Sequence, residues 1–284
     1  MKIQNKLNKG AFSLIELSVV ILIIGILILG VTRGSALLTK TKLSSARSLT
    51  NSSPVASIPD LVIWYETTLE SSFDESNAIG GDALTVDPES QVIWYNNSPK
   101  KIFNVTGVNG DPLYTEVSIN DLPAISFDGN DSLTFNSKAF SGTRYTVFIV
   151  ERRGAAVGYM LSLGGAGAAN SFGYSADAVL GDGVEVGDIA VPTIATVANT
   201  ARISTFISNA VERNVYLNGT AGTANAAALL VADSAGFIGS SDGANFYTGD
   251  ISEIIAFNRG LTVSELNSVI DYLGKKYNIN VDEI

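Results

Sequence analysis

Residues 11–31 read AFSLIELSVVILIIGILILGV, and Glu16 is their one charged side chain. A helix of about twenty apolar residues is roughly 30 Å long, which matches the hydrocarbon thickness of a bilayer. The stretch therefore predicts a membrane-spanning helix. Three lysines and no acid precede it, which favours a cytoplasmic N-terminus and a single pass.

The helix is expected to continue past the apolar stretch. Leu37, Leu38, Leu43, Ala46 and Leu49 recur near helical spacing. A cleavable secretory signal has a shorter apolar region, about 7–15 residues, before a small-residue site. The length of this stretch favours a segment that stays attached. A plain single-span anchor with one stray glutamate is the simplest alternative.

Charge divides the chain near residue 50. Residues 1–50 hold seven of the 18 basic side chains and one of the 28 acidic ones, or +6. The remainder holds 11 bases and 27 acids, or −16, within a formal net charge of −10. A basic head on an acidic body suggests two parts with different surroundings. The acidic balance also argues against nucleic-acid binding, which depends on Lys and Arg at phosphates.

Composition excludes several classes of protein. The 284 residues include no cysteine and no histidine, so disulfide scaffolds, Cys/His zinc sites and Ser-His-Asp or Cys-His catalysis are impossible. A chain that is 46% hydrophobic and only 16% charged is not a disordered tail. The 27 glycines favour a turn-rich β protein.

Glu16 breaks the apolar pattern, and an unpaired carboxylate in such a setting costs several kcal/mol. The segment Lys9-Gly10-Ala11-Phe12-Ser13-Leu14-Ile15-Glu16-Leu17 resembles the type IV prepilin signal. The resemblance implies that a prepilin peptidase cuts before an aromatic residue, that the new N-terminus is methylated, and that the apolar helix becomes a filament core.

The glutamate is the fifth mature residue in that family, which makes Phe12 the first and Ala11 the residue before the cut. Glycine is commoner before the cut, so cleavage after Gly10 stays an alternative. The resemblance implies that Glu16 neutralises the N-terminal amine of a neighbouring subunit. Such a buried pair sets register rather than adding raw stability.

The chain changes character after a polar stretch with two prolines, residues 50–59. Short apolar runs bounded by Gly, Asn and Asp predict an all-β sandwich or barrel. The expected strands are Leu61–Tyr65, Gln91–Tyr95, Ala124–Phe127, Leu133–Phe135, Tyr145–Val150, Tyr159–Leu163, Arg202–Ser208, Val215–Leu217, Phe237–Gly239 and Ile251–Phe257. Asp128-Gly129 and Asn218-Gly219 predict hairpin turns.

One helix is expected in the body. Thr262 and Glu265 form a capping-box pattern before an apolar face that begins at Leu266 and reaches Tyr277. Glu253 lies in an otherwise apolar strand and needs a basic partner, Arg259 or another base.

A second resemblance rests on several segments in order: Leu61–Tyr65, Val92–Tyr95, Leu122–Asp131, Val215–Gly219 and the closing Gly249–Leu261. They resemble the concanavalin A-like, laminin-G-like jelly rolls. The fold class implied is a long N-terminal helix, then a jelly-roll sandwich closed by a C-terminal helix. The expected domains are a leader (1–11), a pilin helix (12–49), a linker (50–59) and a sandwich (60–284).

The body contains residues that could form a catalytic site, a cation site or a sugar-stacking site. No alternating Glu-Asp-Glu strand of the jelly-roll glucanases is present, so the chain is not expected to be an enzyme. Asp128, Asn130 and Asp131 bring oxygens together as a hard cation such as calcium requires, although turn residues are the favoured interpretation. Trp64 and Trp94 are expected in the core rather than on sugar rings.

These resemblances imply a structural subunit, main, minor or tip, of a type IV pilus-like filament that displays a lectin-like domain for adhesion. Expected partners are the prepilin peptidase, other pilin subunits, the inner membrane and a glycan or surface ligand. The expected location is the inner membrane and then an extracellular pilus. The alternatives are a periplasmic pseudopilin of a type II secretion machine and a membrane-tethered carbohydrate-binding module that never assembles.

Overall fold

A computed structural model describes most of the chain. It covers residues 14–73, 93–138, 142–155, 157–163, 171–174, 180–182, 197–222, 224–226, 235–241 and 243–284, and the side chains of 29–33, 35, 36, 180–182, 225 and 226 are not described. The chain divides into two compact units between Lys42 and Leu43.

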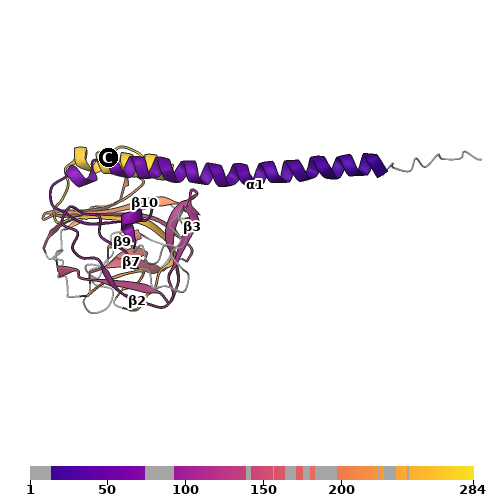
Figure 1. Cartoon of the computed structure of the whole chain (residues 1–284). Helices are drawn as coiled ribbons and strands as arrows, with labels where there is room; N and C mark the ends of the chain where they lie inside the picture. The colour runs from indigo at the N-terminus through magenta and orange to yellow at the C-terminus, as the bar shows by residue number, and fades with distance from the viewer. Residues whose placement is uncertain are drawn as a thin grey trace, which may run out of the picture. The chain divides into compact units, whose positions relative to one another are not determined.

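Helix α1 runs from Leu14 to Asn51 and is 38 residues long. Most of it belongs to the first unit, and its last turns belong to the second (Figure 1). Within the described part of the chain, no helix has the length and apolar character needed to cross a membrane. The expected span is therefore not confirmed; residues 11–13 of that stretch, and the side chains of 29–33, lie outside the description.

The second unit is built from short strands. Their bounds are β1 Leu61–Glu66, β2 Val105–Asn109, β3 Leu113–Ile119, β4 Leu122–Asp128, β5 Ser132–Phe135, β6 Arg144–Arg153, β7 Gly158–Ser162, β8 Ser171–Tyr174, β9 Leu180–Asp182, β10 Arg202–Asn209, β11 Glu212–Leu217, β12 Thr220–Ala221, β13 Asn225–Ala226, β14 Gly236–Ile238 and β15 Thr248–Phe257. Two 3-10 turns, Val55–Ser57 and Glu70–Ser72, precede and follow β1, and helix α2, Val263–Tyr277, follows β15.

The strands form two antiparallel sheets (Figure 1). The larger has the order β12-β11-β10-β6-β15-β4-β3, with β1 also paired to β15 and β13 to β11. The smaller has the order β2-β5-β14-β7-β8-β9. One apolar cluster, with Tyr65, Trp94, Phe135 and Ile149 among its members, contains side chains from both sheets. This cluster is the core of a β-sandwich.

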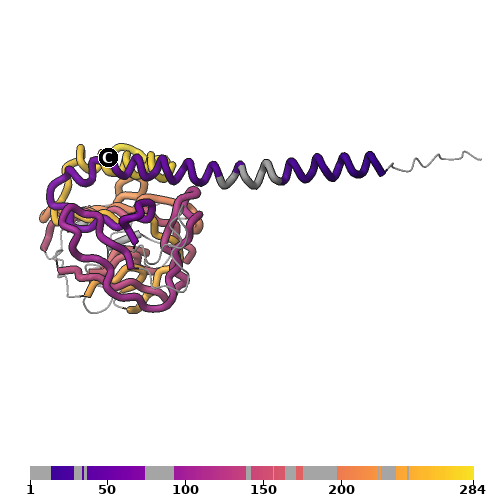
Figure 2. The backbone as a smooth tube through the Cα atoms, viewed as in Figure 1, coloured from indigo at the N-terminus to yellow at the C-terminus, as the bar shows by residue number. Residues whose placement is uncertain are grey.

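A second apolar cluster explains why the central strands are apolar on both faces. In β6, Val147 and Ile149 belong to the inter-sheet cluster, whereas Phe148 and Val150 belong to the second one. The second cluster joins the larger sheet to α2 and to Ala46 of α1. Figure 2 shows the C-terminal segment beside the last turns of α1. An N-terminal helix, an all-β sandwich and a C-terminal helix are thus confirmed.

Helix α2 begins with the predicted capping box. The Thr262 side chain accepts a hydrogen bond from the Glu265 backbone N–H, and the Glu265 carboxylate accepts one from the Thr262 N–H at 2.9 Å. Asn278, at φ 50°, ends the helix in a left-handed conformation. These two ends satisfy backbone groups that would otherwise lack partners.

Two local predictions were wrong. Residues 93–95 form no strand, although Trp94 is fully buried. Their backbone makes single hydrogen bonds instead: the Val105 N–H donates to the Trp94 carbonyl at 3.0 Å, and the Tyr95 N–H donates to the Ser72 carbonyl at 2.9 Å. The turn at Asp128-Gly129 does not join a hairpin, since β4 and β5 lie in different sheets. The Asn218-Gly219 hairpin is confirmed by the pairing of Leu217 with Thr220.

Candidate functional site

The predicted processing site, Ala11 and Phe12, lies outside the described residues. Glu16 lies in the first turn of α1, where the positive end of the helix dipole favours a carboxylate.

The described surface of α1 from residue 14 to residue 28 is apolar apart from Glu16 and Ser18. Each of its large apolar side chains is between 48% (Val19) and 86% (Leu14) exposed in the single chain. A helix that is apolar all round is stable only when lipid or other helices cover it. This part of α1 therefore requires lipid or other helices to cover it.

A group of acidic side chains lies at the corner between β4 and β5. Asp111, Asp128 and Asp131 each place one carboxylate oxygen within 4.8 Å of the others. The sequence indicated Asp128, Asn130 and Asp131; Asp111 was missed because it lies about twenty residues earlier. The Asn109-Gly110-Asp111 sequence is typical of a turn, and it was the pattern that could have indicated Asp111.

Both carboxylate oxygens of Asp131 accept hydrogen bonds from backbone N–H groups. Asp131 Oδ1 accepts the Asp111 N–H at 2.9 Å, and Oδ2 accepts the Asp128 N–H at 3.0 Å. Asp128 Oδ1 in turn accepts the Asn130 N–H at 3.1 Å. Gly110, at φ +75°, is required here because a Cβ would lie 2.2 Å from Asp131 Oδ1.

Calcium usually takes six to eight oxygen ligands, and three carboxylates supply only part of such a set. Burial raises the pKa of Asp131, which opposes the charged form that a cation needs. The arrangement fits a backbone-ordering turn better than a cation site, so calcium at Asp128, Asn130 and Asp131 stays a weak prediction.

Asp131→Ala is expected to lower the free energy of unfolding by about 1.5–3 kcal/mol, because two backbone donors lose a charged acceptor. Asp111→Ala, a matched control with an exposed side chain, should change it by less than about 0.5 kcal/mol. Urea unfolding followed by tryptophan fluorescence measures both. If calcium raised the stability of the parent chain but not of Asp131→Ala, the turn interpretation would be wrong.

Both tryptophans lie in the core, as predicted. Trp94 is fully buried and Trp64 is 5% exposed. Their indole N–H groups donate to the Glu66 carbonyl at 2.8 Å and to Glu253 Oε1 at 2.7 Å, respectively. Neither ring offers a face for a sugar.

A buried charge cluster lies between α2 and the larger sheet. The Lys276 ammonium lies 2.8 Å from Glu253 Oε2 and 3.0 Å from Glu66 Oε2, and all three side chains are fully buried. Lys276, not Arg259, is therefore the partner of Glu253. A basic partner was expected, but no local pattern singled out Lys276, because it follows an exposed lysine in the amphipathic pattern of the helix.

Hydrogen bonds complete this cluster. Glu253 accepts from the Tyr272 and Tyr277 hydroxyls, each at 3.0 Å. Burial alone would raise the pKa of Glu66, but the Lys276 charge and the Ser72 and Thr68 donors lower it below its usual value. Burial alone would lower the pKa of Lys276, but the two carboxylates hold it well above its usual range.

A further buried carboxylate, Glu151, is likewise held inside the sandwich. Its Oε2 accepts from the Tyr247 hydroxyl at 2.7 Å, and its Oε1 lies 3.4 Å from Arg202 Nε. Burial raises its pKa. Glu151, Glu66 and Glu253 are thus each paired with a buried basic side chain.

Residues 6–32 match the family model described as the prokaryotic N-terminal methylation motif. No curated protein matches the sequence.

The sandwich is similar to solved structures. A mutant of Trypanosoma rangeli sialidase displaying trans-sialidase activity is 14% identical, with a TM-score of 0.54 over 88% of this chain and 40% of that one. The binding domain of Paraclostridial Mosquitocidal Protein 1 is 12% identical, with a TM-score of 0.51 over 75% of this chain and 52% of that one. The chain spans about half or less of these structures, and the likeness shows the fold alone.

The chain thus carries a prokaryotic N-terminal methylation motif ahead of a β-sandwich domain.

Proposed function

We propose that this chain is a structural subunit of a type IV pilus-like filament and displays its sandwich for binding at a surface. The match of residues 6–32 to the N-terminal methylation motif carries the proposal. The subunit is inserted in the inner membrane, a prepilin peptidase cuts between Ala11 and Phe12, and the new N-terminus is methylated. A pseudopilin of a secretion machine shares this motif and is the alternative.

The described helix supports assembly. Its side chains between residues 14 and 28 are apolar apart from Glu16 and Ser18, and neighbouring copies of the same helix would cover them in a filament. In such a core the Glu16 carboxylate needs a cation. The methylated amine at Phe12 of a neighbouring subunit supplies one.

The sandwich supports display rather than catalysis. Three of the described buried carboxylates, Glu66, Glu253 and Glu151, contact Lys276 or Arg202 inside the protein. We propose a concanavalin A-like or laminin-G-like jelly roll with a lectin-like, non-enzymatic role. One fold neighbour is titled a binding domain, which is an analogy of fold.

Mass spectrometry of the N-terminal peptide tests the proposal. Filaments sheared from cells are expected to yield a peptide that begins at methylated Phe12. The same peptide in the membrane or periplasm alone would favour the pseudopilin. A peptide that retains Met1, or an uncut segment from Lys9 to Glu16, would mean a simple anchor and would overturn the proposal.

A further inference from the structure

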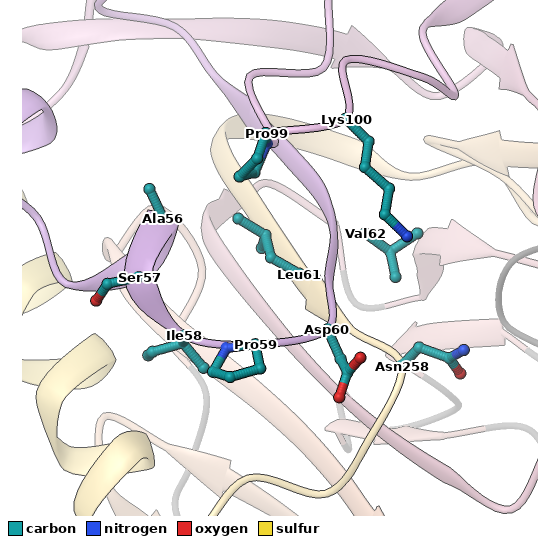
Figure 3. Close-up of a pocket in the computed structure, with 10 residues that line it drawn as sticks. All are labelled: Ala56, Ser57, Ile58, Pro59, Asp60, Leu61, Val62, Pro99, Lys100 and Asn258. Atoms are coloured by element: carbon teal, nitrogen blue, oxygen red, sulfur yellow. The ribbon is translucent and has the colours of Figure 1, made fainter.

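A pocket of about 300 Å³ opens where β1 begins. Its lining comes from residues 56–62, from Pro99 and Lys100, and from Asn258 at the end of β15 (Figure 3). This volume lies at the lower end of the range of small-ligand pockets. All of the lining belongs to the second compact unit.

Hydrogen-bonded backbone holds the pocket in shape. On one rim, the Ser57 and Ile58 N–H groups donate to Pro54 and Val55 carbonyls at 3.0 and 3.2 Å. On the floor, the Asn258 N–H donates to the Asp60 carbonyl at 3.0 Å. A turn closed by Lys101 N–H and Ser98 O at 2.9 Å forms the other rim. A preformed site of this kind loses little entropy on binding.

Three different polar groups face the pocket from separate segments. Asp60 is held at φ 63°, and its carboxylate is 63% exposed with Arg259 Nε 3.7 Å away. Figure 3 shows Asn258 next to Asp60, with the two side chains pointing in different directions, and the Lys100 ammonium near Val62. Among the described residues, no carboxylate lies within 4.0 Å of the Lys100 ammonium, and the Asn258 amide has no hydrogen-bond partner.

The remaining lining is apolar and includes Pro59, Pro99 and Val62. A ligand matched to this set has several hydroxyls that both donate and accept, together with a face of C–H groups. The carboxylate would accept from hydroxyls, the ammonium would donate, and the amide would do both. A free phosphate fits less well because the Asp60 carboxylate would repel it.

We infer that this pocket binds one sugar unit of a glycan, with Asp60 and Asn258 on its hydroxyls. The inference rests on the proposed binding role and assigns a place to it. Sequence patterns did not reveal the site, because residues 60, 100 and 258 are brought together only by the pairing of β1 with β15 and by the turn at Ser98–Lys101.

The test uses the full chain in a detergent without sugar groups, applied to an array of neutral and acidic oligosaccharides. Asp60→Asn keeps a residue type that tolerates left-handed backbone and removes the charged acceptor. It is expected to weaken binding to the glycans that the parent retains about tenfold or more. Lys100→Gln and Asn258→Ala should each weaken it as well.

Matched controls exist outside the pocket. Asp121→Asn changes another exposed aspartate with a positive φ (69°). Because Lys101 belongs to the turn that forms one rim, the second control is a lysine outside the pocket, the 65% exposed Lys275 on α2, in the form Lys275→Gln. Asp121→Asn and Lys275→Gln should both bind like the parent. Equal losses in pocket and control variants would indicate general charge effects and would overturn the inference. Tryptophan fluorescence verifies that each variant is folded.

The outcomes separate the two proposals. Glycan binding by the parent that all three pocket variants retain would reject the pocket and leave a binding role for the sandwich intact. Absence of binding to every glycan would reject the pocket and the lectin-like role together. Neither result bears on the filament, which the Phe12 peptide tests independently.

Discussion

Replacement of Lys276 by methionine is expected to lower the free energy of unfolding of the sandwich by about 3–5 kcal/mol. The variant keeps a long side chain but removes the ammonium that lies 2.8 Å from Glu253 and 3.0 Å from Glu66. Both carboxylates are fully buried. They would remain without a cation, and an unpaired buried charge is among the most destabilising changes known.

The adjacent lysine is a matched control. Lys275 is 65% exposed and lies 2.5 Å from Asp271 on the helix surface. Lys275→Met should therefore change the stability by less than about 0.5 kcal/mol. Urea unfolding followed by tryptophan fluorescence suits this test, because Trp64 and Trp94 donate to Glu253 and Glu66. Equal stabilities of the two variants would contradict the prediction.

The pH dependence provides a second check. The pKa of Glu66 is lowered in the folded chain from its usual 4.5, so its contribution is complete above that pH and is lost as the pH falls through the folded value. Without Lys276, the burial of Glu66 would raise the pKa of its carboxyl. The stability gap between Lys276→Met and the parent should thus shrink on acidification from neutral pH. A gap independent of pH would point to lost packing instead.

Substitution of Glu16 by glutamine is expected to reduce the yield of sheared filaments about 100-fold or more. The proposed pair with a neighbouring N-terminal amine would lose its negative member, and about 3–5 kcal/mol at each subunit contact corresponds to that factor. Cleavage before Phe12 should still occur, so the processed subunit would accumulate in the membrane. Quantification of the Phe12 peptide in filament and membrane fractions measures both.

Ser18→Ala is the control for this experiment. Ser18 lies on the same helix, and its hydroxyl donates to the Ile15 carbonyl at 2.8 Å, so its loss should leave assembly unchanged. Filaments of Glu16→Gln at the parental yield would reject the charge pairing. Loss of filaments in both variants would indicate that this turn of the helix tolerates no change, whatever the charge.

Sequence patterns predicted the elements whose signals are local. The Thr262–Glu265 capping box fixed the start of α2, and Asn218-Gly219 fixed a hairpin through the positive φ that both residues adopt. Runs such as Ile251–Phe257 are apolar at every position except polar Ser252 and Glu253, and they became central strands buried on both faces. Such signals depend on neighbours in sequence.

The remaining errors concern contacts distant in sequence. The dipeptide Asp128-Gly129 is typical of a hairpin turn, but β4 and β5 on either side of it belong to different sheets. The sheet that each strand joins depends on pairing with strands distant in sequence. Lys276 has the spacing of a helix residue, and nothing nearby indicates that Glu66, 210 positions away, faces it. The pocket residues share the same difficulty. A tertiary site has no local pattern when each of its groups comes from a different segment.

The position of the pocket also has a mechanical meaning. Its lining begins at Ala56, and only residues 52–55 separate it from the end of α1 at Asn51. The last turns of α1 are held to the sandwich by Arg47, whose Nε donates to the Thr68 carbonyl at 2.8 Å.

Tension between a captured ligand and a filament core would therefore run through a few residues beside β1. The rest of the sandwich would carry almost none of the load. A tether of this design can hold under pulling without requiring a force-resistant domain.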